Sequence, residues 1–314
     1  MAGVMLQVWK LHELHPDRSL IPAVAVRLMR LSGARVWAFK VVDGGGLYSE
    51  FANDQRLYTD TAAALHKAGY EIAAWGYHYG RKWLGFVGPE REARAVLRAR
   101  EILAFDTYFV DAEAEWERTA RAGDATKLVR PLKEAGLSVW LESFRYPTLH
   151  PIRWHEWARV LNGGWAPQVY WEQATNAAAQ VERSHREHMA IADLPFWPVF
   201  PAYCRNDPYW CPTAKQFYAA VAKAHDLGAV GVGAWKAEWL SAGWPLRRPF
   251  VDALKTWPDT PPDPDPPDQD PCDVGEALNL AYDLKRQADA LLTEVQTLAK
   301  DAKALLSALQ AMQK

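Results

Sequence analysis

The sequence predicts an α/β chain that begins with a (β/α)8 TIM-type barrel and ends with a linker and a coiled-coil helix. In residues 1–257, eight short apolar runs alternate with amphipathic stretches. The stretch PDTPPDPDPPDQDP, 258–271, is almost entirely Pro and Asp, and a heptad pattern of apolar residues fills 273–314. Eight strands that alternate with helices in about 250 residues are typical of a barrel.

The barrel prediction is based on the apolar runs and on the glycines between them. The runs predict strands at 3–9, 34–42, 70–79, 107–115, 137–144, 166–173, 196–203 and 229–239. Amphipathic stretches predict helices at 60–69, 90–104, 127–136 and 214–228. Three of these helices end in glycine, at Gly69, Gly136 and Gly228, as left-handed helix caps often do. A doubly wound sheet is the alternative, but KLHELHP after the first strand is not the Gly-rich turn expected there.

The C-terminal part predicts oligomerisation. A linker at 258–272 should run extended as a semi-rigid spacer, because Pro interrupts helices and sheet ladders. Apolar residues then recur at the two seam positions of about six heptads, Val274, Ala281, Ala288, Val295, Ala302 and Leu309, and Ala277, Leu284, Leu291, Leu298, Leu305 and Met312. Three further leucines, at 278, 292 and 306, widen the stripe and favour a homo-oligomer of three or more helices. A helix that packs back on its own barrel is the alternative.

Composition excludes several classes of function. A net charge of −2 gives no reason to expect nucleic acid or an anionic membrane as a partner. No apolar run reaches the roughly 20 residues that span a bilayer. No secretory signal is visible, which leaves the location open between an ordinary cytoplasmic protein and one carried by a virion or released by lysis.

The cysteine content argues against a disulfide framework, and the tryptophan content favours a carbohydrate ligand. Three cysteines are too few for a disulfide framework, and Cys204 and Cys211, which flank RNDPYW, are predicted to be free thiols, with a disulfide as the alternative. We expect neither a metal site nor a cofactor. The 16 tryptophans fill core in part, but their excess favours a carbohydrate ligand, since aromatic faces stack on sugar rings.

Polar and aromatic side chains gather where the predicted strands end, which is the active-site face of a barrel. The predicted substrate-binding residues are Lys40, Asp43, Tyr77, His78, Glu142, Tyr170, Trp171, Glu172, Tyr203, Trp235, Lys236 and Glu238.

The end of the fourth strand, TYFVDAEAEWE at 107–117, carries acids at every second position. Alternate residues of a strand share a face, so Asp111 and Glu113 should lie at the barrel mouth if Phe109 points inward. One of these carboxyls, with a pKa raised by burial and by its neighbour, could protonate a glycosidic oxygen while the other steadies the transition state. The acids at 115 and 117 are instead predicted to cap the next helix and to pair with Arg118 or Arg121.

Three motifs together resemble glycoside hydrolase family 25, the lysozyme-type muramidases. These are FKVVDGG at the second strand, AGYEIAAWGYHYG at the third and FVDAEAE at the fourth, and the resemblance covers about residues 34–115. It implies that Glu113 is the general acid and that Asp111 assists at the N-acetyl group or the anomeric centre. The first strand departs from the family pattern, because LQVWKLHEL places Lys10 and His12 where the family has an Asp.

The expected function is a glycoside hydrolase that acts on a bacterial cell-wall or surface polysaccharide of the peptidoglycan type, multimerised by its tail. The missing first-strand acid leaves a second hypothesis, a catalytically degenerate glycan-binding or structural barrel in a phage tail or surface assembly. An enzyme of another barrel class is a third, since this fold hosts many chemistries.

Overall fold

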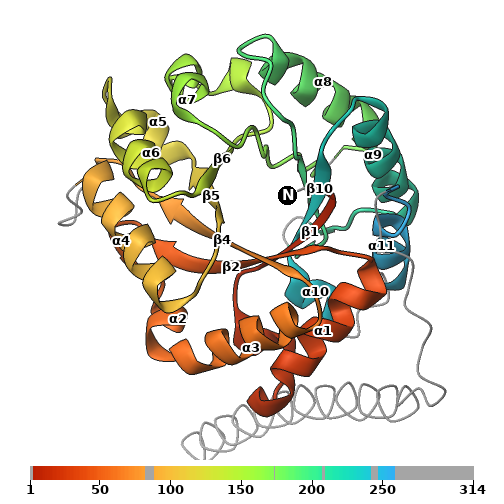
Figure 1. Cartoon of the computed structure of the whole chain (residues 1–314). Helices are drawn as coiled ribbons and strands as arrows, with labels where there is room; N and C mark the ends of the chain where they lie inside the picture. Colours follow the sequence, from red (N-terminus) through yellow and green to blue (C-terminus); the bar gives the residue numbers. More distant parts are fainter. Residues whose placement is uncertain (1–2, 82–87, 173, 207–208, 242–246, 259–314) are drawn as a thin grey trace, which may run out of the picture. The chain divides into compact units, whose positions relative to one another are not determined.

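The computed structural model describes residues 3–81, 88–172, 174–206, 209–241 and 247–258 (Figure 1). Apart from Pro258, the predicted linker and the predicted coiled coil lie outside the described residues. Both therefore stay predictions.

The described chain is built on a curled parallel sheet, as predicted (Figure 1). Its strands are β1 (Gly3–Val8), β2 (Val36–Asp43), β4 (Glu71–His78), β5 (Thr107–Ala112), β6 (Ser138–Glu142), β7 (Val199–Pro201) and β10 (Gly231–Trp235). They pair in the order β6-β5-β4-β2-β1-β10-β7, with every contact parallel. A short β3 (Gly46–Leu47) pairs antiparallel to the end of β2. The arrangement is that of a TIM-type barrel.

The prediction of a regular strand at 166–173 is wrong. Isolated bridges connect this part of the chain to both neighbours, with Trp165 and Gln168 each bridged on two sides. Pro167 lies between these two residues and has no N–H to donate to a ladder. Gly164 precedes them, and a Cβ there would lie 2.1 Å from the carbonyl oxygen of Pro195, so the chains approach too closely for any other residue. Residues 165–168 thus join β6 to β7 without forming a full ladder.

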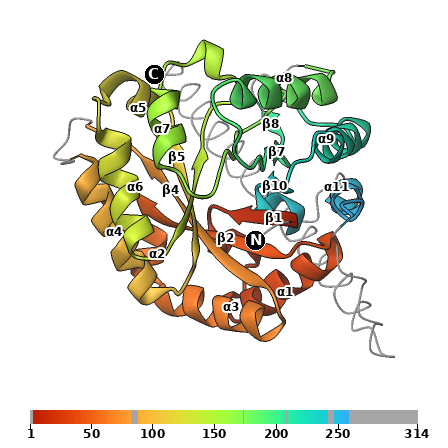
Figure 2. The ribbon, with the colours of Figure 1, turned by 45° about the horizontal axis from the view of Figure 1, so that its top comes forward.

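Helices cover the outside of the sheet (Figures 1 and 2). They are α1 (Ile21–Ser32), α2 (Ser49–Asn53), α3 (Gln55–Lys67), α4 (Pro89–Ile102), α6 (Asp124–Glu134), α7 (Trp154–Val160), α8 (Ala177–Met189), α9 (Ala214–Asp226) and α11 (Arg247–Leu254). The predicted helices correspond to α3, α4, α6 and α9, and the three predicted cap glycines have φ values of 85°, 85° and 74°. No helix in the described ranges is long and apolar enough to cross a membrane.

Short elements follow several strands at the mouth of the barrel. Helix α5 (Ala114–Thr119) begins after β5, and α10 (Ala237–Ser241) begins after β10, so both strands end earlier than predicted. Glu113 terminates the ladder because it takes the position before the first turn of α5. The other short elements are three 3-10 helices, η1 (Leu11–Leu14), η2 (Arg18–Leu20) and η3 (Pro147–Leu149), and a hairpin of β8 (Arg205–Asn206) and β9 (Tyr209–Trp210).

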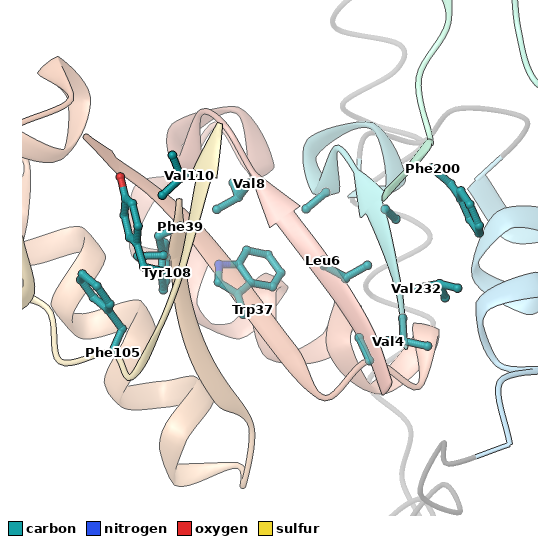
Figure 3. Packing of buried hydrophobic residues seen from close by; sticks show 14 of the residues in the cluster. Val4, Leu6, Val8, Trp37, Phe39, Phe105, Tyr108, Val110, Phe200 and Val232 are labelled. Atoms are coloured by element: carbon teal, nitrogen blue, oxygen red, sulfur yellow. The ribbon is translucent and has the colours of Figure 1, made fainter. Parts of the chain in front are cut away.

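Alternation along the strands separates two apolar layers. Side chains such as Val4, Leu6 and Val8 of β1 pack outward toward the helices, and Figure 3 shows them with other members of this layer. The intervening Met5 points inward and packs with Trp75, Phe109, Trp140 and Trp197 in the barrel interior. Much of the tryptophan is therefore core, and the polar inward positions lie near the carboxyl ends of the strands.

Candidate functional site

Three carboxyl side chains meet at the mouth of the barrel. Phe109 points into the interior, so Asp111 two residues later does as well. Glu142 lies opposite Asp111 on the neighbouring strand β6. Glu113 follows β5 directly, and its carboxyl hydrogen-bonds that of Asp111. The structure thus brings together the two residues predicted to be catalytic and adds a third acid beside them.

Burial makes these acids hold protons more tightly than usual. Burial raises the pKa of Asp111 well above its ordinary value, and the nearby charges of Glu113 and Glu142 raise it further. Burial also raises the pKa of Glu113, although hydrogen bonds with Gln168 and Asp111 oppose the shift. The pKa of Glu142 rises to about 8 for the same chief reason. At neutral pH the group therefore contains carboxylic acids able to donate a proton.

Two glutamines that the sequence reasoning missed hold the acids in place. Gln168 donates from Nε2 to Oδ1 of Asp111 at 3.0 Å, and Gln7 of β1 donates from Nε2 to Oε2 of Glu142. Oε1 of Gln7 is buried and has no hydrogen-bond partner in the described part of the chain. The signal for Gln7 was available, because it is the one amide in the apolar run GVMLQVW and lies at an inward position.

An opening lies next to the acid pair. A cavity of about 340 Å³ is lined by Glu113, Phe144, Arg145, His150, Gln168, Tyr170, Glu172 and Arg205. The rings of Phe144 and His150 stack with their centroids 3.5 Å apart and form a flat wall. A larger cavity of about 1000 Å³ contains Trp116, Ile152 and Trp154 but none of the three acids. We assign the site to the smaller cavity, because Glu113, one of the proton donors, lines it.

Tyrosines and further acids form hydrogen bonds at the ends of the neighbouring strands, and of these residues Tyr170, Glu172 and Arg205 line the opening. Tyr77 donates its hydroxyl hydrogen to Glu115, and Tyr203 donates to Glu172. Arg205 also donates to Glu172, at 2.5 Å. Tyr170 packs edge-on against Tyr203 with ring centroids 5.7 Å apart. The predicted residues of the later strands thus form one side of the site.

The predicted roles of the two following acids hold only in part. Glu115 lies in the first turn of α5 and 3.6 Å from Arg118, as predicted, but it also accepts from Tyr77. Glu117 lies 3.0 Å from Nδ1 of His150, so its predicted pairing with an arginine is wrong.

The opposite side of the mouth is basic and aromatic. Lys40 lies 3.6 Å from Asp43, and the stacked rings of Trp235 and Trp9 are 6.2 Å apart. Lys236 lies 3.9 Å from Glu238, whose buried Oε1 accepts from the backbone nitrogens of Trp9 and Lys10. These contacts lie at the ends of β1, β2 and β10 and define a second half of the mouth.

Two predicted ligand residues point away from the mouth. Trp171 is fully buried and packs on Phe200 and Phe217, because its neighbour Tyr170 takes the inward direction. His78 is also fully buried, 2.9 Å from the hydroxyl oxygen of Tyr108 and 3.5 Å from Glu92. Both predictions of substrate contact are wrong for the same reason, since adjacent residues face opposite layers.

The prediction of two free thiols is also wrong. Cys204 and Cys211 form a disulfide. The hairpin of β8 and β9 pairs Arg205 with Trp210 and so brings the flanking cysteines together, with their Cα atoms 4.3 Å apart. Sequence spacing alone did not show this hairpin.

Among the described residues, no group of three His, Cys, Asp or Glu side chains is placed to hold a metal ion.

Comparison with known proteins identifies the fold. No family model matches the chain, and no curated protein matches it by sequence. The catalytic domain of a hyperthermophilic chitinase from Pyrococcus furiosus is similar in structure, with a TM-score of 0.60 and 12% identity over 81% of this chain and 94% of that one. So is the family 18 chitinase ChiB of Flavobacterium johnsoniae, with a TM-score of 0.56 and 9% identity over 81% and 94%.

A third similar structure is the spore cortex-lytic enzyme SleL of Bacillus megaterium, with a TM-score of 0.56 and 9% identity over 81% of this chain and 74% of that one. At such low identity these likenesses establish the barrel fold alone. They are chitinase-type barrels, so the resemblance to family 25 that the three sequence motifs suggested is not supported.

Proposed function

We propose that this chain is a glycoside hydrolase that cleaves a bacterial cell-wall or surface polysaccharide, with peptidoglycan as the first substrate to test. The observation that carries the proposal is the hydrogen-bonded pair of Asp111 and Glu113, both with raised pKa values, at the edge of a cavity of about 340 Å³. Glycoside hydrolysis needs a carboxylic acid that is still protonated at working pH and can reach the leaving oxygen.

Glu113 is the proton donor in this proposal, because it is the member of the pair that lines the cavity. Its raised pKa keeps a proton available for the glycosidic oxygen. Asp111 lies behind it, 6% exposed, and is held by Gln168. Asp111 is therefore placed to orient the donor and to balance charge as the proton leaves.

The close contact within the pair restricts the mechanism. Hydrolases that place one carboxyl on each side of the sugar ring keep the two groups roughly 5 to 9.5 Å apart. Two carboxyls that hydrogen-bond each other are too close for that arrangement. A substrate-assisted reaction fits better, in which a group of the substrate stabilises the cationic centre. The N-acetyl groups of wall polysaccharides can serve in this way.

The experiment compares the native chain with Glu113→Gln on purified bacterial walls and on chitin, and it measures released reducing ends. We expect the substitution to lower turnover by roughly 10² to 10⁴, the usual contribution of a general acid. Glu101→Gln is the matched control, since Glu101 is exposed on the outer helix α4. Equal activity of the native chain and Glu113→Gln would refute the assignment of the proton donor.

A second candidate is a degenerate barrel that binds glycan or serves as a structural part of a phage tail or surface assembly. The depth of the acids favours it, because Glu142 is 1% exposed and Asp111 is nearly as inaccessible. Binding to walls without release of reducing ends by the native chain would support this alternative. In either case we propose that residues 273–314 multimerise the barrel, which raises avidity for a repetitive polymer.

A further inference from the structure

Three lysines surround one indole ring on the side of the mouth away from the cavity. The ammonium groups of Lys10, Lys40 and Lys236 lie 4.9, 6.0 and 4.6 Å from the ring centroid of Trp9. Trp9 and Lys10 follow β1, Lys40 lies on β2 and Lys236 follows β10, so three adjacent strands converge here. We call these three lysines and Trp9 the Trp9 cluster.

Two of the ammonium groups form only long ion pairs with nearby acids. Lys40 is 3.6 Å from Asp43, and Lys236 is 3.5 Å from Glu13 and 3.9 Å from Glu238. These separations exceed a hydrogen bond. A structural ion pair in the same chain is much closer, with Arg81 at 2.6 and 2.7 Å from the oxygens of Asp124. Each ammonium group has three N–H donors, so Lys40 and Lys236 can donate to a further acceptor beside these acids.

Burial of these two lysine side chains costs free energy. Each is 8% exposed, and ammonium groups removed from water must be compensated by partners. Burial lowers the pKa of Lys40. Burial likewise raises the pKa of Glu238 to about 7, so near neutral pH this acid carries only part of its charge. Buried charges that are incompletely paired are typical of binding sites.

We propose that the Trp9 cluster binds an acidic substituent of the glycan, so that the preferred substrate is an anionic polysaccharide rather than a neutral one. Lys40 and Lys236 donate to the acid group, while the half-buried rings of Trp9 and Trp235 contact the sugar. Lys40 is electrostatically coupled to Asp111, so the anion site and the acid pair share one mouth. This anion site rests on the proposed function, from which its glycan ligand is taken, and it adds the chemical class of that ligand.

The first test measures binding by calorimetry with the full-length Glu113→Gln chain, so that turnover does not consume the probe. The probes are chitohexaose, peptide-free peptidoglycan strands with free lactyl carboxylates, and the same strands after methyl esterification. We expect the free-acid strands to bind about tenfold or more tightly than the ester, the contribution of one or two charged hydrogen bonds. This comparison needs no variant of the cluster. Equal affinity for acid and ester, together with equal affinity for chitohexaose, would overturn a carboxylate site.

A glycerol-phosphate polymer tests the other source of negative charge. Tighter binding of this polymer than of the free-acid strands would support the anion site and identify phosphate as its ligand. If none of the anionic probes exceeds chitohexaose, the proposal fails.

Variants then place the effect at the cluster. Lys236→Gln and Lys40→Gln in the Glu113→Gln background should each lose about tenfold in affinity for the preferred anion and little for chitohexaose. Lys67→Gln is the control, because Lys67 is exposed at the end of α3, where the chain enters the opposite end of the barrel. An anion preference that survives both cluster substitutions would overturn the assignment. Hydrolysis by the native chain is scored separately, so an inactive chain that still prefers anions refutes only the proposed reaction.

Discussion

Gln168 donates a hydrogen bond of 3.0 Å to Asp111 and so ties the irregular segment between β6 and β7 to the end of β5. The amide also hydrogen-bonds Glu113 and Glu142, so one side chain contacts all three acids of the site. Its hydrogen bonds oppose the rise in the pKa values of Glu113 and Glu142.

Gln168→Met should lower kcat about tenfold with a smaller change in KM, because it removes a hydrogen bond to charged groups worth roughly 1.5 to 3 kcal/mol. In the native chain this hydrogen bond opposes the rise in the pKa of Glu113. Its loss should therefore raise that pKa further and move the alkaline limb of the pH profile upward. Steady-state kinetics from pH 4 to 9 measure both effects. Gln55→Met at the start of α3 is the control. An unaltered pH profile would show that Gln168 does not position the acids.

Stability should fall as pH rises from 6.5 to 8. Glu142 has a folded pKa of about 8 against 4.5 for the ordinary group, so the folded state binds more protons in this window and loses stability as they leave. One such group contributes about 2 kcal/mol over this range. Asp111, Glu113 and Glu238 act in the same direction.

Urea unfolding at several pH values measures this slope, and Glu142→Gln should reduce it. His188 has the opposite sign, because burial lowers its pKa from 6.5 to about 4, but most of its effect falls below pH 6.5 and only a small remainder opposes the slope above it. The same slope in the native chain and Glu142→Gln would contradict the shifted pKa of this acid.

Reduction of the Cys204–Cys211 disulfide should cost about 2 kcal/mol of stability, the value expected for closing a short loop. It should also weaken glycan binding, since Tyr203 and Arg205 flank Cys204 and both hold Glu172. Mass spectrometry before and after alkylation detects the bond. Unfolding curves of Cys204→Ser/Cys211→Ser give the energy, and a double variant of native stability and affinity would contradict this role.

Truncation after residue 257 should yield a soluble monomer, whereas the full chain should form a trimer or larger oligomer. The reason is the apolar seam at 273–314, which needs partner helices to be buried. Light scattering of the two proteins at equal concentration decides this. Leu291→Lys/Leu298→Lys in the full chain is a second test, since two charges in the seam should dissociate the oligomer without removing the tail.

The elements that repeat along the sequence were predictable, and those set by tertiary contacts were not. Helices that end in Gly69, Gly136 and Gly228 could be found because the caps are local. The inward direction of Asp111 followed from strand alternation. The same alternation, applied one residue further along, would have removed His78 and Trp171 from the predicted site.

The remaining errors have non-local causes. No single-sequence pattern showed that Gln168 would cross to Asp111, or that a short hairpin would bring Cys204 and Cys211 together. Glu142 was identified as a strand-end acid, but its raised pKa depends on burial by residues from other strands.

The segment between β6 and β7 contributes Gln168 and Tyr170 to the mouth while bonding to its neighbours only through isolated bridges. Insertions or exchanges in it can reshape one wall of the opening and leave the register of the seven paired strands intact. This wall can therefore change at small cost to folding.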